Sequence, residues 1–181
     1  VEMFKVSELV IFNRCRKETP RASYRRIARA ANPRAQVAFE MADGEEASDE
    51  DELPYDLKAD VIEIEDADYG VFYMDAMEKP ERYNGRTVHF RAMMCKPKWG
   101  AKGIFIPGRH VMVCCAEDVQ FVGYIAKGDP LLSKPFKNRD WIWVTARIGY
   151  ERRKEYDGAG PVYTAIKVEP ASAPEEAMVY L

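Results

Sequence analysis

The chain has 181 residues, of which 47% are hydrophobic and 31% are charged, and its formal net charge is −3. This composition is typical of a folded globular protein and excludes general disorder. No apolar run reaches the roughly eighteen residues of a transmembrane helix, and the run Val10–Phe12 is too short for the core of a signal peptide. We therefore expect one substantial core, with or without an attached arm, and no membrane span.

The first forty residues are basic. Residues 1–36 carry nine Lys or Arg against three Glu, a net charge of +6. Two helices are expected here, one from Phe4 to Arg16 and one from about Ala22 to Ala31. The second of these helices is amphipathic. Such an arm, assigned to residues 1–41, can bind an anionic membrane or nucleic acid, or can pack on the rest of the protein with its basic face in water.

An acidic segment follows the arm. Residues 40–68 carry fourteen acids against one lysine, a net charge of −13, and residues 42–60 have few large apolar side chains. We interpret 42–60 as a linker whose charges are solvated or fold back on the basic arm. Order is expected to return with the alternating strand Val61–Glu65. A helix is then expected from about Tyr69 to Lys79, with Asp66 or Asp68 as its N-cap.

From Arg86 onward the pattern is that of strands and turns. The apolar alternation predicts five strands, at about residues 86–95, 103–115, 119–126, 140–151 and 161–168. A longer connection, 127–139, separates the third strand from the fourth. This count and spacing favour a mainly β fold, an OB-like five-stranded Greek-key barrel over residues 61–181, with a β-sandwich as the alternative. The tail, 169–181, is expected to run extended along the barrel.

The stretch Arg109–Gly123 combines strand-like alternation with adjacent thiols and two acids. It predicts a strand, a polar turn and a second strand, with Cys115 and Asp118 close enough to share a ligand. Cys114 and Cys115 point to opposite faces of a strand, so they are not expected to pair with each other. A disulfide from Cys95 to one of them, buried free thiols, and metal ligation all remain open.

A metal site is the most specific chemistry that these residues suggest. Thiolates suit zinc or copper(I), and the candidate ligands are Cys115, Asp118, Cys114 and Cys95. His110 lies on the same strand face as Cys114 but about 13 Å from it, at about 3.3 Å per residue, which is too far to bind the same ion. No CxxC or HxxxH spacing supports the site. The alternative is that the cysteines are structural and that Asp118 caps the turn.

The order of these motifs resembles the C-terminal domain of the bacterial DUF1980 family, the YcgQ-like subunits of a two-component membrane permease. The segment VIEIEDADYGVFYMDAMEKPERYNGRTVHF is similar to the family's strand, helix and following strand. The family's central motif is matched by Arg109, Cys114, Cys115, Asp118 and Gly123. Its later motifs are matched by Trp141 to Ala146 and, loosely, by Pro161-Val162, Pro174 and Tyr180. The resemblance covers Val61–Leu181, about two thirds of the chain.

The resemblance implies an OB-like fold, an integral-membrane permease subunit as partner, and a location at the cell envelope, on the extracytoplasmic face of the membrane. It implies no reaction, because none is established for the family. The chain departs from the family pattern in three ways: it lacks membrane helices and a His-rich stretch, and it carries the basic-acidic segment 1–60. We therefore expect a non-enzymatic domain of a permease complex that binds a partner or a substrate ion, with zinc as the candidate cofactor.

Single-stranded nucleic acid is the alternative ligand, because small OB barrels bind it with aromatic and basic side chains. Residues 81–181 carry sixteen Lys or Arg against eleven acids, a net charge of +5. The candidate contacts are Trp141, Trp143, Arg109 and Lys98. Trp141 and Trp143 share one strand face and Ile142 and Val144 the other, and we expect the tryptophan face to be the core side. Catalysis is not expected, since no base is placed beside Cys115.

Overall fold

The computed structural model describes residues 9–15, 24, 27–28, 31–32, 36–42, 53–112, 119–156 and 158–180. The chain divides into two compact units, one within residues 1–56 and the other within residues 57–179. The sequence-based boundaries at residues 41 and 60 stay predictions.

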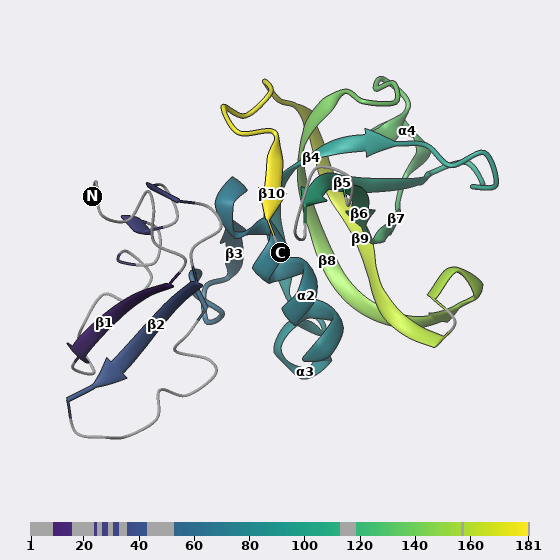
Figure 1. The fold of residues 1–181 in the computed structure, drawn as a ribbon. Coiled ribbons are helices and arrows are strands. Elements are labelled where there is room, and N and C mark those ends of the chain that lie inside the picture. The colour runs from purple at the N-terminus through teal and green to yellow at the C-terminus, as the bar shows by residue number, and fades with distance from the viewer. Residues whose placement is uncertain are drawn as a thin grey trace. The chain divides into compact units, whose positions relative to one another are not determined.

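The first unit contains two parallel strands, β1 (Leu9–Cys15) and β2 (Gln36–Met41), shown in purple and dark blue (Figure 1). The predicted helix Phe4–Arg16 is therefore wrong over Leu9–Cys15. The segment LVIFNRC is rich in β-branched and aromatic side chains, which favour a strand. Within it, Val10 is buried while Ile11 beside it is half exposed, the alternation of a strand and not of a helix.

The second predicted helix of the arm is borne out at the residues that are described. Tyr24, Ile27, Ala28 and Ala31 are all helical, and the residues between them lie outside the described part. Ala28 is fully buried against Val10, and the ring of Tyr24 stacks on Phe12 at 5.1 Å. The arm is thus a strand-and-helix unit and not a purely helical one.

The second unit begins with a strand and three short helical segments and continues almost entirely as strands (Figure 1). Its first elements are β3 (Val61–Ile64), the 3-10 helix η3 (Asp66–Asp68), α2 (Tyr69–Glu78) and α3 (Pro80–Tyr83). The remaining elements are β4 (Thr87–Cys95), β5 (Ile104–Met112), β6 (Gln120–Gly123), β7 (Ile125–Lys127), α4 (Pro130–Ser133), β8 (Trp141–Arg153), η5 (Lys154–Tyr156), β9 (Gly158–Pro170) and β10 (Met178–Tyr180).

Five strands close into a barrel. β4 pairs with β5, β5 with β7, β7 with β9, β9 with β8, and β8 returns to β4. The β7–β9 pair is parallel and the other four are antiparallel. This closed, mixed order is the Greek-key barrel of the OB type that the sequence predicts. β3 adds to β4 in parallel, and β10 adds to β5.

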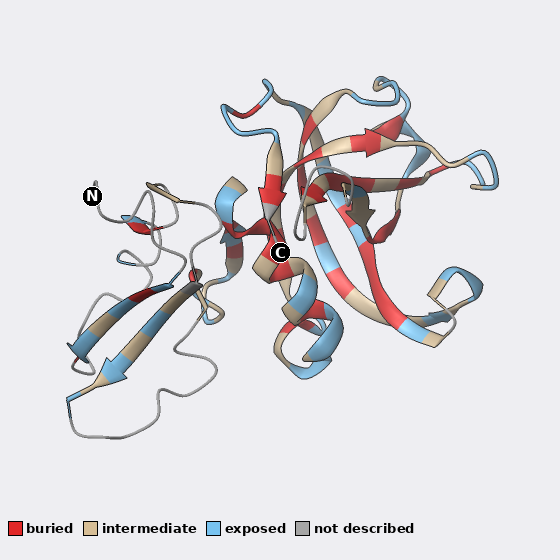
Figure 2. Ribbon diagram, viewed as in Figure 1, coloured by how far each residue is buried: buried red, intermediate tan, exposed pale blue. Residues whose placement is uncertain are grey.

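The barrel interior is filled by side chains. Along β4 and β8 every second residue is buried, and the buried rows are Val88, Phe90, Ala92, Met94 and Ile142, Val144, Ala146, Ile148 (Figure 2). Tyr163 and Tyr124 add fully buried rings from β9 and from the residue before β7. Such a core excludes water and stabilises the fold, and it leaves recognition to the outer surface and the loops.

The predicted strands agree with the observed ones within the described residues, with two refinements. The third strand, predicted at 119–126, is divided at Tyr124 into β6 and β7. The extended tail ends as strand β10, which the sequence analysis did not predict. Residues 113–115 of the second predicted strand lie outside the described part.

Helix α2 is attached to the barrel by tyrosine hydroxyls. Tyr124 donates to the backbone oxygen of Tyr73, and Tyr150 donates to that of Ala76 at 2.5 Å. Burial raises the pKa of both Tyr124 and Tyr150, so each stays a neutral donor at physiological pH.

Among the described residues, no helix combines the length and apolar character needed to cross a bilayer.

Candidate functional site

The two strands of the predicted hairpin are present and pair with each other. β5 and β6 are antiparallel, with Val111 opposite Gln120 and Gly108 opposite Gly123. A Cβ on Gly123 would collide with the backbone of Pro107 and Gly108, so this close approach requires glycine. Cys114, Cys115 and Asp118 fall in residues 113–118, which lie outside the described part, so their arrangement stays a prediction.

Cys95 is the candidate ligand that the structure does describe. It is a free, half-buried thiol at the end of β4, opposite Ile106. Burial raises the pKa of its thiol, which disfavours the thiolate that a metal would need. Among the described residues, no three His, Cys, Asp or Glu side chains gather in a group that could hold a metal ion.

The most organised polar cluster is formed by Asp66 and two arginines from different strands. Asp66 in η3 accepts hydrogen bonds from Arg91 of β4 and from Arg109 of β5, the latter at 2.6 Å. The Arg109 side chain is fully buried, whereas that of Asp66 is 27% exposed. A carboxylate shared by two guanidinium groups ties η3, β4 and β5 together at one point.

The electrostatics of the cluster follow from this geometry. Burial raises the pKa of Asp66, but the hydrogen bond from Arg91 and the charge of Arg109 outweigh it, so its pKa is below the ordinary value of 3.8. Burial lowers the pKa of Arg109 against the opposing effect of Asp66. The hydrogen bond with Asp66 raises the pKa of Arg91. All three groups are therefore charged at neutral pH.

Each arginine of the cluster also lies on a tryptophan. The Arg109 guanidinium carbon is 5.0 Å from the centre of the Trp141 ring, and that of Arg91 is 5.0 Å from Trp143. The Nε of Arg109 is buried without a hydrogen-bond partner among the described residues, and the indole face supplies its electrostatic contact. The His89 ring stacks on Trp143 at 5.1 Å.

The expectation that Trp141 and Trp143 face the core is wrong. Both are only half buried, whereas Ile142 between them is fully buried inside the barrel. The narrow interior takes the smaller aliphatic side chains of β8, and the wide indoles lie on the outer surface beside the arginines of β4 and β5. The tryptophans thus serve as packing faces for the protein's own cations.

The same two arginines hold the C-terminal tail. Arg91 donates to the backbone oxygen of Ser172 at 3.3 Å, and Arg109 donates to those of Glu176 at 2.9 Å and Ala177 at 3.3 Å. The next residues form β10, which pairs with β5. The cluster is therefore the point at which η3, two barrel strands and the tail meet.

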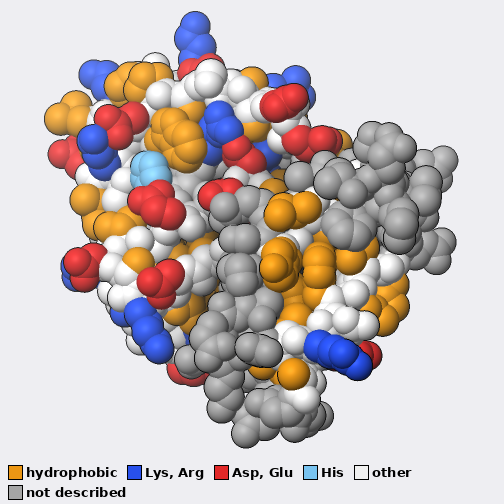
Figure 3. Space-filling view, turned by 90° about the vertical axis from the view of Figure 1, so that its left-hand side faces the viewer, with side chains coloured by type: hydrophobic (Ala, Val, Ile, Leu, Met, Phe, Trp, Pro, Cys, Tyr) orange, Lys and Arg blue, Asp and Glu red, His pale blue; other side chains and the backbone are white. Residues whose placement is uncertain are grey.

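This arrangement gives little support to the nucleic-acid contacts that the sequence suggests. Arg109 is buried, and Trp141 and Trp143 are half buried with Arg109 and Arg91 over their rings. Lys98, on the loop after β4, is the exposed member of the set. In the space-filling view, hydrophobic, basic and acidic side chains are mixed over the described surface of one face (Figure 3). That face shows no continuous basic track for a nucleic-acid strand.

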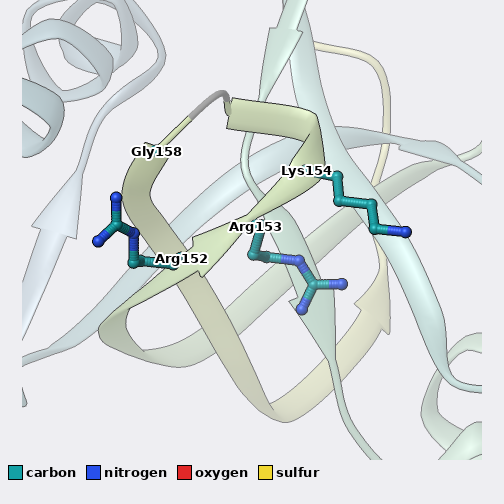
Figure 4. Close-up of a pocket in the computed structure, with 4 residues that line it drawn as sticks. All are labelled: Arg152, Arg153, Lys154 and Gly158. Atoms are coloured by element: carbon teal, nitrogen blue, oxygen red, sulfur yellow. The ribbon is translucent and has the colours of Figure 1, made fainter.

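A hollow of about 350 Å³ lies at the tip of the β8–β9 hairpin, lined by Arg152, Arg153, Lys154 and Gly158 (Figure 4). Arg152 points away from Arg153 and Lys154, so the three cations do not converge on one ligand (Figure 4). Arg153 also forms ion pairs with Glu151 at 3.4 Å and with Glu155 at 3.6 Å. The hollow therefore does not form an anion-binding site.

Sequence reasoning missed the roles of Asp66 and Arg91. Asp66 was expected as a possible helix cap, but the N-cap position of α2 is held by Asp68, which makes no side-chain capping hydrogen bond. One signal for Arg91 was present: it occupies an outward position in the alternation of β4. Its partner could not be found, because Asp66 is 25 residues away in sequence.

The geometry defines a class of protein: a closed OB-type barrel domain with a packed interior and its tail anchored on the outside. A family model identifies the particular group. Residues 40–181 match the DUF1980 C-terminal domain, so this chain belongs to the DUF1980 family. The match confirms the resemblance seen in the sequence and extends it upstream of Val61.

Other comparisons add no function. No curated protein matches the chain. Among solved structures, an aspartyl tRNA synthetase from Entamoeba histolytica is similar at 10% identity with a TM-score of 0.31. The similarity covers 51% of this chain and 20% of that one, so the chain spans about a fifth of the synthetase. A likeness of this size supports no conclusion about either fold or ligand.

The Asp66 cluster predicts a large loss of stability on Asp66→Asn. The substitution keeps the side-chain volume but leaves the buried Arg109 without its counter-charge, so the free energy of unfolding should fall by about 3 kcal/mol. Glu169→Gln is the matched control, because the Lys167–Glu169 pair is exposed and should contribute less than about 1 kcal/mol. Denaturant unfolding measures both, and equal small losses would refute the structural role of the cluster.

The same cluster predicts an acid sensitivity. Because the folded-state pKa of Asp66 is below its ordinary value of 3.8, ionisation stabilises the folded state fully above that value. The stabilisation is lost as the pH falls through the folded-state pKa. Between about pH 5 and about pH 2, the wild-type protein should therefore lose more unfolding free energy than Asp66→Asn. Parallel pH-stability curves for the two proteins would contradict this expectation.

Proposed function

We propose that this chain is a non-enzymatic domain of a membrane permease complex at the cell envelope, where its barrel binds the integral-membrane subunit and its β5–β6 hairpin binds a soft metal ion. The observation that carries the proposal is membership of residues 40–181 in the DUF1980 family. The packed interior of the barrel supports it, because a filled barrel recognises its ligands with outer surfaces and loops.

The hairpin supports the ion-binding part. Val111 of β5 pairs with Gln120 of β6, so the two strands are held together on either side of the segment 112–119. In sequence, this segment contains Cys114, Cys115 and Asp118. Two thiols and a carboxylate within five residues are a ligand set suited to zinc, or to copper(I) through the thiolates. Binding would release the thiol protons, so affinity would increase with pH.

Cys95 does not belong to the proposed ligand set. It lies opposite Ile106, six positions before Met112 on β5, which corresponds to about 20 Å along the strand. The first thiol of the hairpin segment comes after Met112. Cys95 is therefore the matched control for a test of the site, since it is a free cysteine in the same unit.

The metal test uses the full chain, reduced and loaded with zinc. Elemental analysis after gel filtration should find about one zinc per chain, and Cys115→Ser should lose most of it because one thiolate is removed. Cys95→Ser should retain the metal. A wild-type chain that is folded by circular dichroism and holds no zinc after loading, or a Cys115→Ser variant that retains the zinc, would refute the zinc site.

The partner test uses the full chain with an N-terminal tag, expressed in its native cells. After detergent extraction of membranes, an integral-membrane permease subunit should co-elute with it in near-equal amount. An unrelated OB barrel with the same tag is the control. Elution of the chain without any integral-membrane protein, under conditions where the chain is folded, would refute the permease assignment.

A further inference from the structure

Two loops join into one surface at an end of the barrel. They are residues 96–103, between β4 and β5, and residues 128–140, between β7 and β8; we call them the loop surface. The backbone nitrogen of Lys96 donates to Asn138 at 2.5 Å, and that of Arg139 donates to the oxygen of Met94 at 2.8 Å. Gly103 has φ 87° and approaches Gly128 so closely that a Cβ would collide with its carbonyl oxygen.

The loop surface is basic although the chain as a whole is acidic. Its two loops carry six Lys or Arg against two Asp, a net charge of +4, whereas the whole chain has −3. Both acids are engaged by the backbone: Asp129 accepts from Leu131 at 2.9 Å and Asp140 accepts from Lys137 at 2.7 Å. The exposed basic side chains are Lys98, Lys102, Lys134, Lys137 and Arg139.

The loop surface also carries the two most exposed large hydrophobic residues of the described part. Leu131 is 67% exposed and Trp99 is 54% exposed. Trp99 lies in the loop between β4 and β5 and Leu131 lies in the short helix α4, and neither belongs to the barrel core. The loop surface therefore combines two large apolar side chains in contact with water with an excess of positive charge.

Backbone strain occurs at the same place. Arg139 has φ 73°, a left-handed conformation that glycine or asparagine adopts at lower cost. It is one of two non-glycine residues with positive φ among those described. An arginine at this position adds a cation to the surface, which a glycine would not.

We propose that the loop surface docks on an anionic lipid bilayer, with Trp99 and Leu131 at the boundary between headgroups and acyl chains and the basic side chains on lipid phosphates. Tryptophan and leucine insert at this boundary, and each nearby Lys or Arg strengthens binding by about fivefold. A nucleic-acid strand would use stacked aromatic rings, but one of the two exposed hydrophobic side chains here is aliphatic. The proposal does not depend on the thiols or on the permease partner.

The test measures co-sedimentation of the full chain with vesicles of phosphatidylcholine, alone or mixed with phosphatidylglycerol. The chain should bind the mixed vesicles and not the neutral ones, and binding should weaken as salt is added. The double variant Lys98→Glu/Lys102→Glu should lower the partition coefficient by at least about tenfold. Leu131→Ser should also lower it, and mixed vesicles should shift tryptophan fluorescence to the blue in the wild type and not in Trp99→Phe.

Two controls match these variants. Arg147→Glu reverses a charge on β8, about 20 Å along the strand from Trp141, and Met74→Ser removes an exposed apolar side chain of α2. Both should bind like the wild type, and circular dichroism checks that every variant is folded. Three results would overturn the proposal: no binding to the mixed vesicles, equal losses in the controls, or a single-stranded oligonucleotide bound in place of vesicles.

Discussion

The carboxylate of Asp66, shared between Arg91 and Arg109, is the interaction on which the rest of the barrel unit depends. It joins a segment before the barrel to two of the barrel's strands, and the same arginines hold the backbone of the tail. A buried guanidinium is costly unless it is paired and hydrogen-bonded. The burial of Arg109 is therefore explained by its position at this junction.

A filled barrel determines where function can reside. The interior is occupied by alternating side chains of the strands, so ligands must meet the outside. On the outside, the tryptophans of β8 are engaged by the protein's own arginines. Among the described residues, the loops at 96–103 and 128–140 carry exposed side chains. We propose two separate tasks for the outside of the domain: ion binding by the thiols that follow β5 in sequence, and membrane docking by the loop surface.

These two proposals are compatible with each other but physically independent. The ion-binding proposal depends on thiolate chemistry in a turn. The docking proposal depends on Trp99, Leu131 and a local net charge of +4 in a chain of −3. The two proposals rest on different residues, so an experiment can refute one of them and leave the other standing.

The sequence by itself determined the barrel strands and their OB-like order, because alternation with a period of two is a local property. The order of its motifs carried the resemblance to the DUF1980 family, which the family model confirms. It also located the β5–β6 hairpin from the turn residues and Gly123. The helix predicted over Leu9–Cys15 is wrong. A short apolar run is compatible with a helix or a strand, and here the pairing with β2 makes it a strand. The tertiary structure alone decided which face of β8 is inside, and which charges meet. Asp66 and Arg109 are 43 residues apart, and no local pattern records a contact made by barrel closure.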